Sequence, residues 1–456
     1  MRTWSPLIAV CLGTFMLLVD VTIVTVALPV LTRDLHSSLS DLQWVLDGYA
    51  LALAALLLGL GSVADRLGRK AVYLVGLVVF ALASLACGLA PDAGALIVAR
   101  FVQGAGAAAM LATTIALLNI AYQGRERAIA FGVWGAVNGA AAAAGPILGG
   151  LLTQHLDWRW IFLVNLPVSV AAIALTVRSV PESRADRGAR FDVAGMATFT
   201  VAVGSVVYAL IRANDAGWTA PGTLGLFGLG AVASVVFVVV ERAAAQPMLD
   251  LRLFRSPAFT GVMVAGLLGQ AAAFAYLIFT SVWLQTALHK GPVMAGVLGS
   301  LPLSGAGFVV AIVAGRFLHD VPARWTIGIG TVLIGFGDLW QSDLDSHSTG
   351  LALLPGLVVA GIGVGASSPS LASSALAAVP RERSGMASGA VNTFRQVGYA
   401  VGVAAYGAVF QAQSDEVTAV RHTLLAAGAT GLLAGATALV LLRHRRSADA
   451  TLASVH

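Results

Sequence analysis

Charged residues are scarce in this chain: they make up 11% of its 456 residues, while hydrophobic residues make up 58%. A soluble chain of this length would carry far more charge, and a disordered chain would carry fewer apolar residues. Cysteine is nearly absent too, since Cys11 and Cys87 are the only two and both lie in apolar runs. This excludes a disulfide framework and a zinc cluster. The composition indicates an integral membrane protein.

The chain also lacks the short motifs that mark ATP-driven and hydrolytic proteins. It contains no Gly-Lys-Ser/Thr string for binding phosphates, no histidine pair at metal-ligand spacing and no nucleophile elbow. Its net charge of +5 is spread between apolar runs rather than gathered in one patch. We therefore expect a protein that is not an enzyme, has no cofactor and no metal, and binds no nucleic acid.

Apolar runs long enough to cross a membrane recur along the whole chain. A helix needs about 20 apolar residues to span the hydrocarbon core. Fourteen runs are of this order, at 7–31, 44–64, 71–90, 94–122, 127–154, 160–179, 191–211, 222–241, 257–286, 292–318, 324–341, 349–378, 385–411 and 423–442. The first is too long for a cleavable signal peptide and has Asp20 within it, so we expect it to be retained. The sequence predicts an all-α integral membrane protein with fourteen transmembrane helices.

Lysine and arginine are unevenly divided among the loops between these runs. If the N-terminus is cytoplasmic, 20 of the 27 basic residues lie on the cytoplasmic side and 5 on the outer side, with Arg100 and Arg395 inside runs. Basic residues are retained in the cytoplasm during insertion. This predicts a multi-pass protein of the cell inner (cytoplasmic) membrane, with both termini in the cytoplasm.

The two halves of the chain share an internal repeat. The string at 135–138 recurs at 389–392, an offset of 254 residues, and the same offset relates Gly61 to Gly315. Runs one to six are therefore predicted to be repeated by runs nine to fourteen. We expect an N-terminal six-helix bundle at 1–180, a linker with two inserted helices at 181–256, a C-terminal six-helix bundle at 257–446 and a cytoplasmic tail at 447–456.

Five stretches of the sequence carry a family resemblance. They are LVDVTIVTVALP at 18–29, GSVADRLGRK at 61–70, RFVQG at 100–104, the glycine-rich stretch at 139–150 that ends in GPILGG, and DWRWIFLVNLP at 157–167. With these, the chain resembles the major facilitator superfamily, specifically its fourteen-helix drug:proton antiporter branch of multidrug and quaternary-ammonium exporters. It departs from that branch at Thr25, where asparagine is usual, and in a degenerate second copy of the loop motif. The resemblance implies a major facilitator fold whose two bundles rock about a central cavity.

The stretch at 61–70 joins the second and third runs. The Asp65 carboxylate can pair with nearby bases and accept hydrogen bonds from helix-end amides, and glycines allow close approach. We expect a gating latch on the inner face, formed by Gly61, Asp65, Arg66, Gly68, Arg69 and Lys70. The alternative is that the bases only set topology, although Asp65 adds nothing to such a signal.

The fifth run has almost no bulky side chains between residues 135 and 150. Small residues permit tight helix contact, and proline bends a helix. The pattern alone also fits an ordinary small-residue interface. The resemblance implies an antiporter helix that seals the cavity, with Gly139, Gly145, Pro146, Gly149 and Gly150 as its residues.

Two acids lie inside apolar runs, where a carboxylate is costly. Asp20 should lie roughly 15 Å, and Asp47 roughly 5 Å, below the outer ends of their helices. Both could face one outward-opening vestibule. A carboxyl group in such a place can bind a proton near neutral pH and release it when a cation arrives, as proton–drug exchange requires. The alternative is that each acid merely pairs with a buried base.

Arg100 also needs a partner, because an unpaired guanidinium in the membrane is costly. Its expected depth, about 9 Å from the outer end, falls between those of Asp20 and Asp47. Gln103 and Gly104 share its helical face. The resemblance implies a role for Arg100 and Gln103 in proton transfer, while the alternative is an arginine that only ties helices together. Arg395 raises the same question in the second half.

A drug-binding cavity combines apolar or aromatic contacts with a few polar groups. We take as candidate cargo contacts Asp20, Asp47, Trp134, Asn138, Gln270, Phe274, Trp283, Asp338 and Asn392. Each of them could instead be a packing or lipid-facing residue.

Together these features favour a proton-coupled efflux antiporter for amphipathic, cationic drugs or antibiotics. Its expected partners are small drug-like molecules, protons and the lipid bilayer, and we expect a monomer. One alternative is a narrow-specificity exporter of an endogenous metabolite, antibiotic or lipid, and another is a non-transporting membrane receptor or scaffold.

Overall fold

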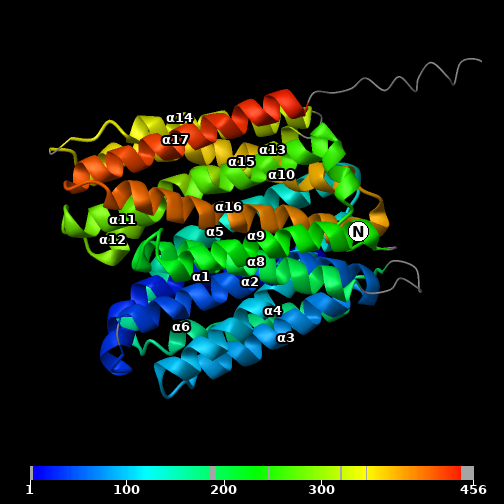
Figure 1. The fold of residues 1–456 in the computed structure, drawn as a ribbon, viewed down its shortest axis with the longest axis horizontal. Helices are drawn as coiled ribbons and strands as arrows, with labels where there is room; N and C mark the ends of the chain where they lie inside the picture. The colour runs from blue at the N-terminus through cyan, green and yellow to red at the C-terminus, as the bar shows by residue number, and fades with distance from the viewer. Residues whose placement is uncertain are drawn as a thin grey trace, which may run out of the picture.

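The computed structural model describes residues 4–37, 39–184, 192–244, 247–318, 321–345 and 347–442. Within these ranges every regular element is a helix. The long helices run side by side along the longest axis of the molecule (Figure 1). The predicted all-α membrane fold is therefore confirmed, while the predicted tail at 447–456 lies outside the described residues.

The first half of the chain forms one helical bundle. Its helices are α1 (Ser5–Asp34), α2 (Leu39–Leu67), α3 (Arg69–Gly88), α4 (Ala93–Ala121), α5 (Gly124–His155), the short α6 (Trp160–Leu163) and α7 (Asn165–Ser179). The sharp turn between α2 and α3 requires Gly68, whose φ of 119° is unfavourable for any side chain. Asp92 begins α4 as an N-cap, because its carboxylate accepts a hydrogen bond from the Ala95 amide at 2.8 Å.

The second half forms the other bundle, and two inserted helices lie between them in the chain. The inserted pair is α8 (Val193–Ala216) and α9 (Pro221–Ala243). The second bundle comprises η1 (Leu251–Arg255), α10 (Pro257–Gln270), the π-helical turn η2 (Ala271–Ala275), α11 (Leu277–Thr286), α12 (Pro292–Gly299), α13 (Leu301–Phe317), α14 (Ala323–Gln341), η3 (Gly350–Leu353), α15 (Leu354–Ala377), η4 (Arg381–Arg383), α16 (Ser384–Gln411) and α17 (Glu416–Leu441).

Most of the predicted spans correspond to described helices that could cross a membrane. Ten helices, three of them formed by consecutive elements, are long and apolar enough to cross a membrane, and α12 with α13 adds a pair bent by 47°. The remaining long helices, α5, α14 and α16, have 32, 19 and 28 residues and contain many glycine and polar residues. Ten spans and the bent pair give up to eleven, and these three helices lie at the other predicted runs, so the number of fourteen transmembrane helices stays a prediction.

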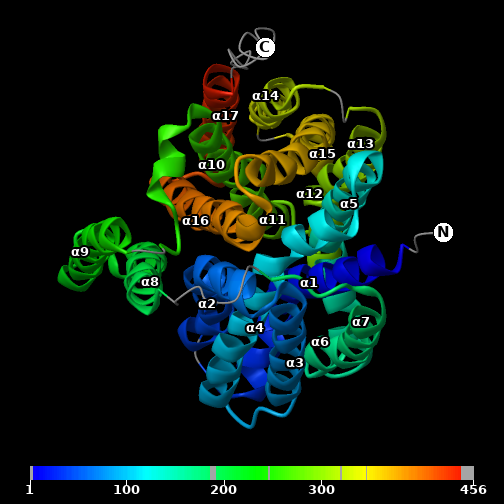
Figure 2. The same cartoon turned by 90° about the vertical axis from the view of Figure 1, so that its right-hand side faces the viewer.

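Viewed end-on, the two bundles face each other and the inserted pair lies to one side (Figure 2). Helix α8 packs against α2 of the first bundle and α16 of the second. The bundles meet where α2 contacts α16 and where α5 contacts α13. The domain boundaries near residues 180 and 256 stay a prediction, because part of the linker is outside the described ranges.

Glycines bring the two bundles into backbone contact at both of these places. A Cβ atom on Gly61 of α2 would lie 2.5 Å from the carbonyl oxygen of Gly385, and one on Gly315 of α13 would lie 2.6 Å from that of Ala128. Gly61 and Gly315 are the residues that the 254-residue offset relates. The repeat therefore places equivalent glycines at the two inter-bundle contacts.

Candidate functional site

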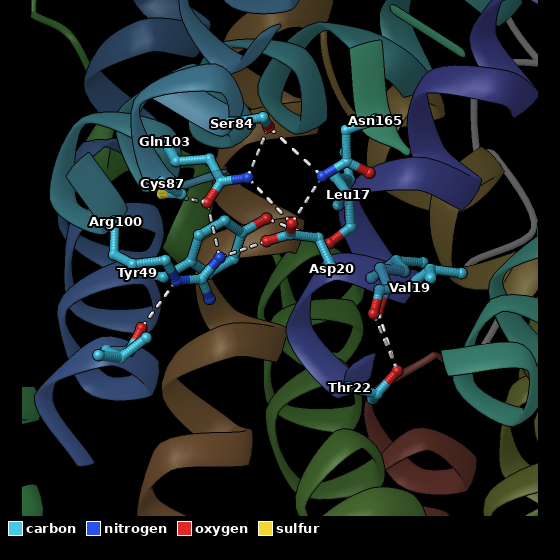
Figure 3. Close-up of polar contacts among 12 residues, drawn as sticks. Leu17, Val19, Asp20, Thr22, Tyr49, Ser84, Cys87, Arg100, Gln103 and Asn165 are labelled. Atoms are coloured by element: carbon cyan, nitrogen blue, oxygen red, sulfur yellow. Dashed lines mark hydrogen bonds and ion pairs between the residues drawn. The ribbon is translucent and has the colours of Figure 1, made fainter. Parts of the chain in front are cut away.

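The first cluster of polar side chains lies inside the first bundle, around Asp20 of α1 (Figure 3). The Asp20 carboxylate is fully buried and forms an ion pair with the Arg100 guanidinium of α4. It also accepts hydrogen bonds from the Gln103 amide at 2.9 Å and from the Asn165 amide of α7 at 2.8 Å. The predicted Asp20, Arg100 and Gln103 thus meet at one site.

Further contacts orient Arg100. Its Nε donates to the carbonyl oxygen of Val45 at 2.7 Å, and its Nη1 donates to Gln103 Oε1 at 2.7 Å. The guanidinium carbon lies 4.3 Å from the centre of the Tyr49 ring, within cation–π range. The α2 and α4 backbones approach closely because Gly104 has no side chain: a Cβ there would lie 2.5 Å from the Tyr49 carbonyl oxygen.

Two residues that the sequence analysis missed complete this cluster. Ser84 of α3 accepts hydrogen bonds from Gln103 at 2.8 Å and from Asn165 at 3.3 Å. Asn165 belongs to the stretch at 157–167 that carries part of the family resemblance, and Ser84 is an isolated polar residue in an apolar run. The site is therefore a buried ion pair held by amides and a hydroxyl group, in which each ion has compensating partners.

Asp47 of α2 lies elsewhere. Its side chain is partly buried and acts electrostatically on Tyr399 of α16, in the other bundle. The partners of Asp20 described above all belong to the first bundle. That Asp20 and Asp47 face one vestibule stays a prediction.

The second cluster joins α2 to the start of α16. Asp65 accepts hydrogen bonds from the backbone amides of Gly385 at 2.7 Å and Met386 at 2.8 Å. Arg69 pairs with the Asp65 carboxylate at 2.7 Å and donates to the carbonyl oxygen of Glu382 at 2.8 Å. The carboxylate thus satisfies amides at a helix N-terminus, where negative charge is favourable.

The other basic residues of this loop point to different partners. Lys70 Nζ donates to the carbonyl oxygen of Val177 at 2.9 Å, away from Asp65. The negative charges of Asp192, Asp65 and Glu241 act on the Arg66 guanidinium, and Asp192 has the strongest effect of the three. Glu182, which the sequence analysis did not single out, accepts hydrogen bonds from the Lys70 and Ala71 amides at 3.1 Å each and so caps α3.

Helix α5 uses its small residues on two faces. Towards α1, a Cβ on Gly145 would overlap Thr22, and one on Gly149 would lie 2.7 Å from the Ile23 carbonyl oxygen. Towards the second bundle, a Cβ on Gly139 would lie 3.2 Å from the Ser304 carbonyl oxygen, and one on Gly150 2.6 Å from a Val293 methyl group. Pro146 lies in the α5 backbone, and its side chain is outside the described residues.

Three of the candidate cargo contacts lie near the junction of the bundles. Trp134 of α5 is buried and its indole N–H donates to Thr14 at 3.2 Å. The Asn138 amide donates to the Trp134 carbonyl oxygen at 2.7 Å. The Asn392 amide of α16 crosses between bundles and donates to the carbonyl oxygen of Leu111 in α4 at 3.1 Å.

The other candidates lie in the second bundle. Gln270 accepts a hydrogen bond from Arg395 of α16, and Phe274 is a partly buried residue of η2. Trp283 is buried, and its indole N–H has no hydrogen-bond partner among the described residues. Asp338 of α14 is fully buried next to Tyr276, and in the described structure neither carboxyl oxygen has a partner of hydrogen-bonding geometry. The role of these residues as cargo contacts stays a prediction.

Among the described residues there is no group of three histidine, cysteine, aspartate or glutamate side chains that could hold a metal ion. The polar chemistry of the chain consists instead of buried ion pairs and amides between long apolar helices. Such a site, in two six-helix bundles with glycine contacts between them, is typical of a membrane transporter of the rocking-bundle kind.

Comparison with known proteins agrees with this class. The sequence model of the Major Facilitator Superfamily matches residues 10–403 and 262–454. The chain belongs to the Major Facilitator Superfamily, and it is a multi-pass membrane transporter rather than an enzyme. The predicted family is confirmed, and the receptor or scaffold hypothesis is set aside.

Several curated relatives are similar over most of the chain. The multidrug resistance protein Stp of Mycobacterium tuberculosis is 37% identical over 89% of this chain and 75% of its own length. The methylenomycin A resistance protein of Streptomyces coelicolor is 34% identical over 96% of this chain and 93% of its own. The puromycin resistance protein pur8 of Streptomyces alboniger is 36% identical over 96% and 88%. The crystal structure of the human organic anion transporter MFSD10 (TETRAN) covers 96% of this chain and 99% of that one, with a TM-score of 0.68 and 14% identity, and shows the fold alone.

Proposed function

We propose that this protein is a proton-coupled efflux antiporter that exports amphipathic drugs or antibiotics by alternating access. The observation that carries the proposal is the buried Asp20–Arg100 pair with its amide partners. Relatives named for multidrug, methylenomycin A and puromycin resistance support a drug or antibiotic as the cargo. Inward movement of protons supplies the energy for export.

Asp20 is the proposed proton carrier. When its carboxylate binds a proton, the ion pair with Arg100 is lost and the guanidinium must rely on Val45 and Gln103. The balance of contacts between α1, α4 and α7 then changes, because all three contribute a side chain to the site. A proton thus biases one arrangement of the first bundle over another, as coupling requires.

The Asp65 cluster serves as the latch that holds one face of the transporter closed. Its hydrogen bonds to the start of α16 exist only while α2 and α16 touch, so they break when the bundles separate there. Arg69 keeps the carboxylate in place, and the glycines Gly61 and Gly68 allow the approach. The basic loops assign this closed face to the cytoplasm.

Helix α5 provides the seal on the other side of the interface. Its glycines permit contact with α1 within the first bundle and with α12 and α13 across the interface. Tight packing excludes water and ions from the path between bundles. We assign this sealing to Gly139, Gly145, Pro146, Gly149 and Gly150.

For the cargo, Asp47 is a better contact than Asp20. The Asp20 carboxylate already has Arg100 and two amides around it, whereas Asp47 is partly exposed. A cationic group would therefore approach Asp47 first. Trp134, Asn138 and Asn392 at the junction of the bundles, and Gln270, Phe274, Trp283 and Asp338 in the second bundle, remain proposed cargo contacts.

The test is ethidium accumulation in everted membrane vesicles driven by an imposed pH difference. Asp20→Asn should lower the initial rate about tenfold or more, which corresponds to the loss of at least one strong contact. Asp345→Asn, a matched change in an exposed loop, should leave the rate unchanged. Full pH-driven transport by Asp20→Asn protein would contradict the assigned proton site.

A narrower cargo range is a second candidate. The methylenomycin A resistance protein and the puromycin resistance protein pur8 are each named for a single antibiotic, which favours an exporter of one compound. Competition distinguishes the two: if many unrelated amphipathic compounds inhibit ethidium efflux, the range is broad. Inhibition by one compound class alone would establish the narrow exporter.

A further inference from the structure

Arg395, a partly buried arginine, lies within the C-terminal bundle. Arg395 of α16 donates from Nε to Gln270 Oε1 at 3.0 Å, and its side chain packs against Gly266 of α10. Among the described residues no carboxylate forms an ion pair with it, and its one hydrogen bond is the bond to Gln270. A guanidinium cannot lose its charge by deprotonation. The bundle thus holds a cation without a counterion, which is costly unless a ligand supplies one.

A small cavity adjoins this arginine. Its volume is about 20 Å³, and its wall includes Gln270, Arg395, Thr331, Ser367 and Ser368. This is room for about one water molecule in the present conformation. All charge on the wall is positive, since no acidic residue is among the lining residues.

Three groups on the wall of this cavity have hydrogen-bond donors left for a ligand. Arginine has only donors, so the oxygen of the Gln270 amide faces Arg395 and its two N–H groups remain for another partner. The hydroxyls of Thr331 and Ser367 donate to their own helix backbones at 2.7 and 2.8 Å, so they offer no further donor. The Ser368 hydroxyl has no such bond in the described structure. The guanidinium, the Gln270 N–H groups and the Ser368 hydroxyl can therefore donate to an anion.

The helix beside the cavity is irregular at this point. Helix α10 ends at Gln270, and the π-helical turn η2 (Ala271–Ala275) follows directly. Such turns interrupt the regular hydrogen-bond ladder and occur frequently at functional sites. Two of the residues that line the cavity there, Gly266 and Gly269, have no side chain. Phe274 of η2 also lines the cavity, so widening it at η2 would require this side chain to move.

We infer that Arg395, with Gln270 and Ser368, forms a subsite for a monovalent anionic group such as a carboxylate. A planar guanidinium binds a carboxylate through two parallel hydrogen bonds, and the two free Nη atoms supply them. The same chemistry suits an anionic group on the transported amphiphile or a small free anion such as chloride. For the first source the inference rests on the proposed function and widens its cargo to molecules with a negative group.

The test measures binding to the full-length protein in detergent by the concentration dependence of its thermal unfolding. The probes are 2-naphthoate, its neutral analogue 2-naphthamide, and sodium chloride. We expect an apparent affinity about tenfold higher for naphthoate than for naphthamide, the size of one charge-assisted contact. Equal affinities for the two naphthalene compounds would overturn the inference.

Variants locate the effect. Arg395→Gln should abolish the preference for naphthoate, Arg395→Lys should keep part of it, and Arg421→Gln, which removes an exposed arginine of α17, should keep all of it. A preference that survives in Arg395→Gln would overturn the assignment. If the Arg395→Gln protein does not fold, the Arg395→Lys protein still tests the assignment. Its preference for naphthoate must be weaker, because a lysine cannot form the two parallel hydrogen bonds of a guanidinium with a carboxylate.

The chloride arm distinguishes the source of the anion. Arg395-dependent stabilisation by naphthoate but not by chloride assigns the subsite to the cargo. Arg395-dependent stabilisation by chloride, with competition against naphthoate, assigns it to a free anion. Because binding in detergent needs no pH gradient, failure here leaves proton-coupled transport untouched, and loss of coupling in vesicles leaves this binding result standing.

Discussion

The fully buried Arg100 of the first bundle and the partly buried Arg395 of the second bundle differ in how their charge is compensated. Arg100 in the first bundle has the Asp20 carboxylate, a glutamine and a backbone carbonyl as partners. Arg395 in the second bundle has only the amide of Gln270. The Asp20–Arg100 site is thus balanced in charge, whereas Arg395 has no ion-pair partner among the described residues and can respond to an anion that enters the second bundle.

In contrast, both bundles use a glycine to bring their backbones into contact. Gly61 and Gly315 occupy equivalent positions of the repeat, and each brings a backbone of one bundle against a backbone of the other. The repeat therefore preserved the way the bundles touch while its charged residues diverged. We expect substitutions at the shared glycines to act alike in both halves, and substitutions of the two arginines to act differently.

The largest difference should come from removing each arginine. Arg100→Ala leaves the Asp20 carboxylate buried without its cation, and breaking such a pair typically costs about 3–5 kcal/mol. Arg395→Ala removes one hydrogen bond to a neutral amide, for which about 1 kcal/mol is expected. Thermal unfolding of the purified proteins gives both values.

A double substitution checks the reason for this difference. Asp20→Asn combined with Arg100→Gln removes both charges, so most of the stability should return while pH-driven transport stays lost. Equal destabilisation by Arg100→Ala and Arg395→Ala would show that the ion pair adds nothing beyond ordinary packing.

The next effect concerns the shared glycines. Gly61→Val and Gly315→Val should each prevent the bundles from closing, because even one Cβ would lie 2.5 or 2.6 Å from a backbone oxygen. We expect pH-driven ethidium transport to fall about tenfold or more in both, since backbone atoms cannot move aside as a flexible side chain can. Gly305→Val, on the same helix as Gly315 but with no atom within 4 Å of its Cβ position, is the control. Normal transport by either interface variant would show that the bundles need not touch there.

A smaller effect is expected from the latch. Asp65→Asn keeps one acceptor oxygen but loses the negative charge that faces two amides and Arg69. The closed state should lose about 1.5–3 kcal/mol, the range for hydrogen bonds to a charged group. Spin labels on the loop ends of α2 and α16 would report a broader distance distribution.

The ion pair between Asp250 and Arg383 on the surface provides the control for the Asp65→Asn experiment. Its two atoms lie 3.1 Å apart, but both side chains are partly exposed. Asp250→Asn should leave the label distances unchanged, because an exposed ion pair contributes about 0–1 kcal/mol. A similar broadening in both variants would mean that Asp65 is not a special contact.

Much of the fold follows from the sequence because hydropathy and charge depend on a window of residues rather than on single contacts. The length of each apolar run predicted the spans, and the 254-residue offset of the repeat related Gly61 to Gly315, which lie at equivalent interfaces. The sequence also singled out Asp20, Arg100 and Gln103 individually. It did not join them to Ser84 or Asn165, because the rotation of each helix about its axis decides which side chains meet.

For the same reason the sequence alone does not decide whether Asp47 and Asp20 face one vestibule. Depth in the membrane can be counted along a helix, but depth does not say which bundle a side chain faces. Glu182 was missed because its partners, the amides at the start of α3, lie about 110 residues earlier in the chain. Long-range contacts of a surface acid leave no periodic signal in the sequence.

The smallest effect concerns two helix caps, one in each bundle. Asp92 accepts from the Ala95 amide at 2.8 Å and Asp415 from the Thr418 amide at 2.9 Å, so both begin a helix in the same way. Hydrogen bonds from the Thr418 backbone and side chain lower the pKa of the exposed Asp415 carboxyl group. A carboxyl group whose pKa is lower in the folded protein stabilises it above the pKa of the unfolded chain, and this contribution is lost as the pH falls through the folded value.

Asp415→Ala should therefore lower the unfolding temperature slightly at neutral pH, and the difference from the unsubstituted protein should shrink as the medium becomes acidic. Asp92→Ala should give a loss of similar size at neutral pH, because the cap geometry is the same. Thermal unfolding from neutral to acidic pH measures both. A pH-independent difference for Asp415→Ala would mean that the carboxylate charge takes no part in the cap, and unequal losses for the two variants would show that the bundles differ in packing as well as in charge.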